Sequence, residues 1–121
     1  MDTITIDDFG KVDIRIGIVI DATVPEWSHW VMKLKVNFGE EIGERTIFSG
    51  IMKFYKPEEL LNKQFPFVIN LEPKKIGPER ELSEGMLMAA SIPFTNEAGE
   101  DDDRPVLMPL MTEVPNGTKV I

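Results

Sequence analysis

The chain has 121 residues, 42% of them hydrophobic, and its 13 Lys and Arg against 21 Asp and Glu give a formal net charge of −8. This size and composition predict one small globular domain and exclude collagen-like, coiled-coil and wholly disordered chains. The lack of cysteine excludes disulfide scaffolds and thiolate catalysis, and the lack of an apolar run of roughly 20 residues predicts a soluble, cytoplasmic protein that contacts no membrane.

Alternating hydrophobicity predicts β-strands in the first third of the chain. In residues 11–20 the even positions are β-branched aliphatics, and Gly17 within this strand predicts a bend or bulge. In residues 32–38 the even positions are apolar, which places Lys33 and Lys35 on the outer face. Both segments therefore have the pattern of strands with one buried face.

Residues 44–50 and 65–71 continue the pattern as a third and a fourth strand. Between them we predict a short helix over residues 55–63, because Pro57 stands at its first turn and two glutamates follow at the positive end of the helix dipole. Residues 86–90 are apolar and predict a fifth strand.

The last part of the chain contains an acidic run and an apolar tail. Residues 96–104 predict a solvated loop, because they combine glycine with clustered like charges. Residues 105–121 predict a β extension whose apolar side chains pack against the barrel flank or against a second copy of the chain.

Three strands, a short helix and two further strands are the chain order of the OB-fold, a five-stranded Greek-key barrel that is widely used to bind oligonucleotides. We therefore predict an all-β protein that forms a single domain over residues 1–121. The barrel is expected at about residues 8–92, with one short helix between its third and fourth strands and the C-terminal β extension outside it.

Six motifs occur in a fixed order in the first three quarters of the chain. They are DFGKVDIRIG at 8–17, KLKVNFG at 33–39, SGI at 49–51, YKPEEL at 55–60, NLEPKK at 70–75 and SEGMLMAA at 83–90. Together they resemble the tRNA-binding OB domain family, which includes carboxy-terminal domains of bacterial methionyl-tRNA synthetase, stand-alone tRNA-binding proteins and the export-related chaperone CsaA. Residues 25–33 depart from that family's His-Pro-x-Ala-Asp-Lys-Leu box, and their spacing looks more like CsaA.

The resemblance implies a homodimer in which the C-terminal extension forms much of the interface, and it implies an RNA site. Outward lysines of an OB barrel contact phosphates, and amide or hydroxyl groups contact base edges. Asn70, however, has the alternative of satisfying backbone groups at a barrel end, Ser83 of capping a turn, and Met86 of packing at the rim. With Lys35 added from its outward position, the expected RNA-binding residues are Lys33, Lys35, Ser49, Asn70, Lys74, Lys75, Ser83 and Met86.

Both tryptophans and the single histidine lie in residues 25–31, within a predicted loop between the first two strands. Because this loop borders the ligand face of OB-folds, Trp27 and Trp30 are candidates for base stacking or for an apolar peptide groove. The alternative is that one of them fills the barrel end or the dimer seam, since large aromatics are mostly buried. His29 stands alone, so we predict neither a catalytic base nor a metal ligand there.

The sequence has no glycine-rich phosphate loop, nucleophile elbow or paired histidines, so we predict a non-catalytic protein without a cofactor or metal. We expect it to recognise tRNA by shape and backbone, as an accessory to a methionyl-tRNA synthetase. Residues 30–80 are its mildly basic part, with 9 basic and 7 acidic side chains. The alternative is a CsaA-like chaperone for unfolded or presecretory polypeptides, favoured by the net acidity, the seven methionines and the tryptophan-bearing loop.

Overall fold

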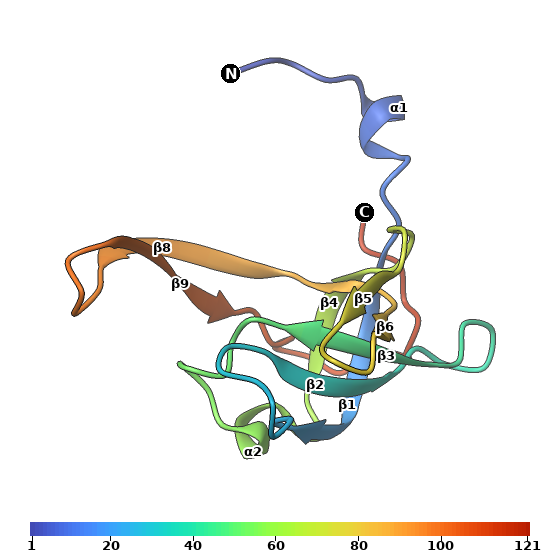
Figure 1. The fold of residues 1–121 in the computed structure, drawn as a ribbon. Coiled ribbons are helices and arrows are strands. Elements are labelled where there is room, and N and C mark those ends of the chain that lie inside the picture. Colours follow the sequence, from blue (N-terminus) through green and yellow to red (C-terminus); the bar gives the residue numbers. More distant parts are fainter.

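Five antiparallel strands form a nearly closed barrel in the computed structural model, which describes all of residues 1–121 (Figure 1). Their order in the sheet is β3-β2-β1-β4-β7. Their bounds are Ile14–Thr23 for β1, Met32–Asn37 for β2, Glu44–Ser49 for β3, Gln64–Val68 for β4 and Met86–Leu87 for β7. The all-β barrel predicted from the sequence is confirmed.

The small helix between β3 and β4 is also present, but it is shorter than predicted. α2 spans Pro57–Leu60, with the proline in its first turn. It ends after one turn because Leu61 is already extended (φ −60°, ψ 132°) and Asn62 takes a left-handed conformation with φ 64°. Leu60 is buried and fastens the helix to the barrel.

The barrel interior is filled by side chains of β2, β3 and β4. The predicted inward-facing residues of β2 are all fully buried, and Phe38, which follows the strand, meets Phe67 of β4 edge to face at 5.3 Å between ring centroids. Gly17 of β1 lies against this cluster, where a Cβ atom would come within 2.5 Å of Cγ1 of Val36. Close packing therefore accounts for glycine at this position.

Both faces of β1 are buried along part of the strand. Val19 belongs to the barrel core and Gly17 faces it, whereas Ile14 and Ile16 are buried on the alternate face, outside this core cluster. Ile20 is 37% exposed and is the extra residue at an irregularity in the pairing with β2 between Val19 and Asp21. The predicted buried face is wrong for Ile20, and also for Val12, which precedes the strand and is 41% exposed.

The barrel closes between β3 and the segment before β7 largely through side chains. The amide of Phe48 in β3 donates to Oγ of Ser83 at 3.0 Å, and the amide of Thr46 donates to Oε1 of Glu84 at 3.2 Å. One backbone bond joins them, from the amide of Glu84 to the carbonyl of Thr46 at 2.8 Å. These bonds satisfy the edge of β3 without a regular ladder.

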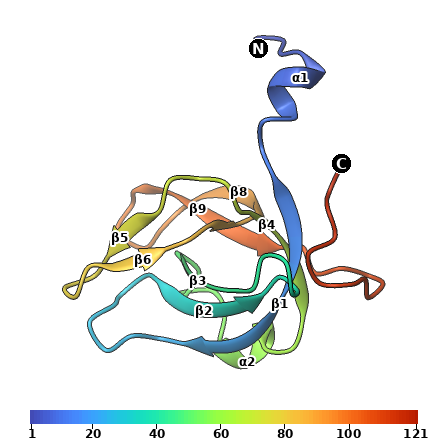
Figure 2. The ribbon, with the colours of Figure 1, turned by 90° about the vertical axis from the view of Figure 1, so that its right-hand side faces the viewer.

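Two hairpins extend beyond the barrel. The first, β5 (Lys74–Ile76) with β6 (Glu81–Ser83), was not predicted and lies beside β2 and β3 (Figure 2). The second pairs β8 (Ala89–Thr95) with β9 (Asp101–Leu107) and projects from the barrel. The apolar segment 86–90 is thus divided between β7 and β8, with Met88 between them.

The acidic run does not form a loop along its whole length. Only residues 96–100 make the turn of the second hairpin, whereas Asp101, Asp102 and Asp103 are the first residues of β9. The prediction of a loop over residues 96–104 is therefore wrong at its C-terminal end. These three residues pair with the exposed strand β8, and their carboxylates stay in contact with solvent. Strand formation therefore does not require a charge to be buried.

The two ends of the chain behave differently. α1 (Ile6–Phe9), capped by Thr5, stands away from the barrel (Figure 2). The C-terminal end returns to β1, because the amide of Gly117 donates to the carbonyl of Ile16 and the amide of Val120 to that of Ile14. This part of the extension packs on its own barrel. Neither helix has the length and apolar character needed to cross a membrane.

Candidate nucleic-acid interface

A groove of about 330 Å³ lies between the loop that precedes β2, the strand β3 and the β5–β6 hairpin. Four of the residues predicted at the RNA site line it, namely Trp30, Lys74, Ser83 and Met86. Most of its remaining lining is apolar and was missed by sequence reasoning, because an apolar residue in a predicted strand or loop gives no sign that it lines a surface groove. These apolar residues include Val31, Phe48, Leu71 and Ile76.

The two tryptophans have different environments. Trp30 lines the groove and is 55% exposed. Trp27 packs 6.3 Å from the ring of Phe48 and lies directly against Gly77, where no Cβ atom would fit. Trp27 therefore packs between Phe48 and the β5–β6 hairpin, while the ring of Trp30 is exposed at the groove.

Ser28 fixes the loop that carries Trp30. Its side chain is buried, and its Oγ accepts hydrogen bonds from the amides of Val31 at 2.8 Å and Trp30 at 3.2 Å. Such a turn holds the exposed indole in place before any ligand arrives, which reduces the entropy lost on binding. A serine four residues before a strand is a recognisable turn signal, although nothing in the sequence shows that it positions a tryptophan.

The four predicted phosphate-binding lysines do not form one patch. Lys33 is paired with Glu81 and Lys35 with Glu44, at 2.8 and 3.7 Å between nitrogen and oxygen. Lys74 and Lys75 are exposed and have no acidic partner, but they lie on opposite faces of the hairpin, because consecutive strand residues alternate. Lys74 is therefore the one unpaired lysine of the four that lines the groove.

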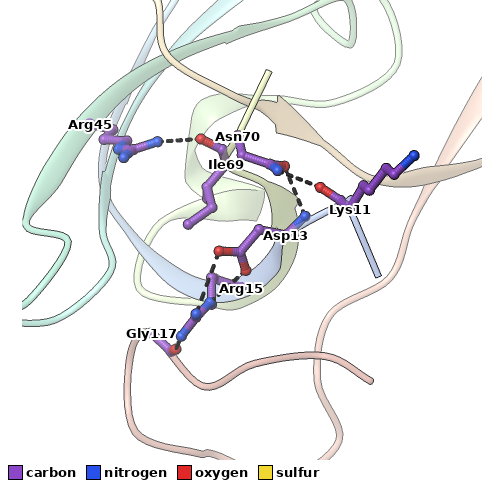
Figure 3. Close-up of polar contacts among 7 residues, drawn as sticks. All are labelled: Lys11, Asp13, Arg15, Arg45, Ile69, Asn70 and Gly117. Carbon is purple, nitrogen blue, oxygen red and sulfur yellow. Dashed lines mark hydrogen bonds and ion pairs between the residues drawn. The ribbon is translucent and has the colours of Figure 1, made fainter. Parts of the chain in front are cut away.

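Asn70 lies at the end of the barrel and has a structural position (Figure 3). Its Oδ1 accepts from the amide of Asp13 at 2.8 Å, and its Nδ2 donates to the carbonyl of Lys11 at 2.6 Å. Both polar atoms of the amide are thus engaged in holding the entry to β1. This arrangement matches the alternative in which Asn70 satisfies backbone groups.

Two arginines complete this barrel end (Figure 3). Nη1 of Arg45 donates to the carbonyl of Ile69 at 2.6 Å. Arg15 donates through Nε to Asp13 at 2.7 Å and through Nη1 to the carbonyl of Gly117 at 3.1 Å. The hydrogen bond to the Asp13 carboxylate raises the pKa of Arg15 above its ordinary value, and partial desolvation opposes the rise. These cations serve the fold.

Ser49, Ser83 and Met86 divide between structural and exposed positions. Ser83 is 7% exposed and its Oγ is bonded to the amide of Phe48, so it contributes to barrel closure. Ser49 ends β3 and lines a neighbouring hollow together with Met86. Met86 is 49% exposed and borders both this hollow and the groove. The structure therefore brings Met86, and not Ser83, to the surface.

The groove combines a flat aromatic ring, apolar walls, the unpaired ammonium group of Lys74 and the carboxylate of Glu72. The ring and the walls suit a planar apolar group, and Lys74 can pair with an anion attached to that group. No three His, Cys, Asp or Glu side chains converge in a way that could hold a metal ion.

A five-stranded OB barrel with such a groove beside β3 defines, as a class, a small ligand-binding module. The chain belongs to the family described as "Putative tRNA binding domain", whose model matches residues 14–119. A methionine–tRNA ligase of Clostridium tetani is 41% identical over 117 residues, which are 97% of this chain and 16% of that protein. The chain thus spans about a sixth of the length of this relative.

Two solved structures have the same architecture along their whole length. A MetRS related protein from Pyrococcus horikoshii has a TM-score of 0.80 at 37% identity, with both chains covered completely. The chaperone CsaA from Bacillus anthracis has a TM-score of 0.77 at 32% identity, covering 99% of this chain and 100% of that one. The predicted membership of a tRNA-binding OB domain family is confirmed.

The role of Ser83 in barrel closure can be tested by comparing it with Ser49, which lies at the surface hollow. We expect Ser83→Ala to lower the free energy of unfolding by about 1–3 kcal/mol, because it leaves the buried amide of Phe48 without an acceptor. Ser49→Ala serves as the matched control and is expected to change stability by less than about 0.5 kcal/mol. Urea denaturation followed by circular dichroism measures both, and equal effects would contradict a closing role for Ser83.

Proposed function

We propose that this chain is a non-catalytic module that binds tRNA at the groove beside β3. The observation that carries the proposal is the exposed ring of Trp30 beside the unpaired ammonium group of Lys74, in a chain that belongs to the tRNA-binding domain family. Single-stranded or looped RNA offers both of the groups that this site suits, an unstacked base and a neighbouring phosphate.

The recognition we propose depends on shape and backbone. An unstacked base lies on the indole of Trp30, and Lys74 contacts a phosphate of the same segment. Met86 also lines the groove with a soft apolar side chain. None of these contacts reads a particular base, so the module is expected to favour an exposed tRNA loop over a particular sequence.

The relatives suggest where such a module acts. The chain corresponds to about a sixth of a methionine–tRNA ligase, so it supplies a binding domain and not the ligase reaction. We propose that it delivers tRNA as an accessory to a methionyl-tRNA synthetase in the cytoplasm. The net charge of −8 weakens long-range attraction for RNA, so binding is expected to depend on local contacts and to decrease with salt.

Lys74 provides the direct test of RNA binding. We expect Lys74→Ala to weaken the affinity for unfractionated tRNA roughly three- to tenfold at low salt and to reduce the slope of log affinity against log salt by about 1. Lys119→Ala removes the same charge from the exposed C-terminal tail beside β1 and is the control. Fluorescence titration measures both variants, and equal weakening, or no binding by wild-type protein at low salt, would refute the proposed site.

We further propose that the chain forms a homodimer through the β8–β9 hairpin. The hairpin projects from the barrel and exposes Ile92 (51%) and Phe94 (36%), with Met108 (38%) directly after it. Residues 117–120 bond to their own β1, whereas the hairpin and Met111 after it keep exposed apolar side chains in the C-terminal region.

Sedimentation velocity tests this association. Wild-type protein is expected to sediment as a dimer, and Ile92→Glu as a monomer, because a carboxylate would be buried in the interface without a partner. Leu61→Glu introduces the same charge at an exposed apolar residue beside α2 and is expected to leave the dimer intact. A monomeric wild-type protein at micromolar concentration would rule out the dimer.

A second candidate function is that of a chaperone. It is supported by the likeness to CsaA over almost the whole chain and by the apolar lining of the groove, where Val31, Leu71 and Ile76 lie beside Trp30. Apolar side chains of an unfolded polypeptide would occupy the same walls as a base. RNA binding requires both the indole of Trp30 and the ammonium group of Lys74, whereas binding of an unfolded polypeptide requires only the indole.

Suppression of aggregation distinguishes the candidates. If the groove binds unfolded chains, the protein should slow the aggregation of an unfolded test protein, and Trp30→Ala should abolish the effect while Lys74→Ala retains it, because the contact is apolar. Light scattering measures the rate. Unchanged aggregation at a molar excess of wild-type protein would eliminate this function. For RNA, in contrast, both substitutions should weaken binding, with stacking worth about 1–3 kcal/mol.

A further inference from the structure

Lys33 is paired in the β2–β3 ladder with Phe48, which lines the groove, and its ammonium group is already occupied by a carboxylate. Its Nζ lies 2.8 Å from one oxygen of Glu81 and 3.0 Å from the other. Both side chains are about 40% exposed, so water and solutes reach the pair. The bidentate contact neutralises the charge that a phosphate would require.

The position of Glu81 is set by the hairpin and is not that of a freely moving side chain. Glu81 begins β6 and pairs with Ile76 of β5. The turn before it is held against the indole of Trp27 through Gly77, and Ser83 at the other end of β6 is bonded to the amide of Phe48. Both ends of the short strand are therefore fixed to the barrel, which keeps the carboxylate opposite Lys33.

Other acidic residues nearby do not have this arrangement. Glu79 lies in the turn of the same hairpin, two residues before Glu81, and it is exposed and makes no ion pair. Glu44 pairs with Lys35 at 3.7 Å, beyond hydrogen-bonding distance. Among the lysines predicted to contact RNA, only Lys33 is thus hydrogen-bonded to a carboxylate within the chain.

We infer that Glu81 is an affinity-limiting residue of the proposed RNA site, which competes with RNA phosphates for Lys33. This inference rests on the proposed tRNA binding. A phosphate gains Lys33 only by displacing Glu81, whose unpaired carboxylate then repels the incoming anion. The contact of one isolated phosphate group with Lys33 is too weak to compensate for the loss of the Lys33–Glu81 pair. An RNA already held at Lys74 and Trp30 presents the competing phosphate at a high effective concentration.

The inference predicts a rank order of affinities for unfractionated tRNA at low salt. Glu81→Gln should bind roughly three- to tenfold more tightly than wild-type protein, because it frees one lysine beside the RNA. Lys33→Ala should bind more weakly than wild type, because it leaves Glu81 unpaired. The double variant Lys33→Ala/Glu81→Gln lacks both charges and should bind about as wild-type protein does.

Two readouts separate this role from a change in stability or in total charge. Glu79→Gln alters the net charge by the same amount and should raise affinity by less than twofold. The slope of log affinity against log salt should be steeper by about 0.7–0.9 for Glu81→Gln than for the double variant, since one lysine–phosphate contact is added.

The outcomes distinguish this inference from the proposed function. If wild-type protein binds tRNA and Glu81→Gln binds no more tightly than Glu79→Gln, the role of Glu81 is refuted and tRNA binding stands. If the double variant keeps the gain of Glu81→Gln, Lys33 is not the competing group and the inference is again refuted. If neither wild-type protein nor Glu81→Gln binds tRNA at low salt, the proposed function fails, and this inference fails with it.

Discussion

The closure of the barrel beside β3 is the interaction on which the rest of the structure depends. Only one backbone hydrogen bond joins this edge to the segment before β7, so the side chains of Ser83 and Glu84 supply the other acceptors for the amides of β3. This seam fixes the end of β6, and β6 in turn places the β5–β6 hairpin beside the barrel. The groove exists because the hairpin stands there, and the positions of Lys74 and Glu81 follow from it.

The fold could be predicted from sequence where one strand face is buried over several residues. The alternation in β2 identified its inward and outward residues correctly, because both faces keep their phase along the whole strand. In β1 both faces are buried along part of the strand, so burial does not follow the alternation of its aliphatic residues, and no residue type marks the extra residue at Ile20. The β5–β6 hairpin is formed by two three-residue strands, too short to produce a periodic pattern.

The candidate site was predictable in its residue types and less so in their roles. Motif resemblance pointed to Lys33, Ser83 and Asn70, yet the structure gives each of them a partner within the chain, because a sequence does not show which polar groups are already satisfied. Lys74, Trp30 and Met86 are the predicted residues left unpaired or exposed at the groove. The outward lysines of β2 are neutralised locally, because Glu81 of β6 pairs with Lys33 and Glu44 of β3 pairs with Lys35.

The bonds between residues 117–120 and β1 also bear on how the chain folds. Arg15 and the carbonyl of Gly117 are 102 residues apart in sequence, and the amide of Gly117 bonds to Ile16 in the same strand. Contacts at such separations require a large loop to close before they contribute stability, which slows folding relative to helical domains of similar size. During synthesis, β1 emerges long before its partner at the C-terminus. This edge of the first strand therefore stays open until residues 117–120 have left the ribosome.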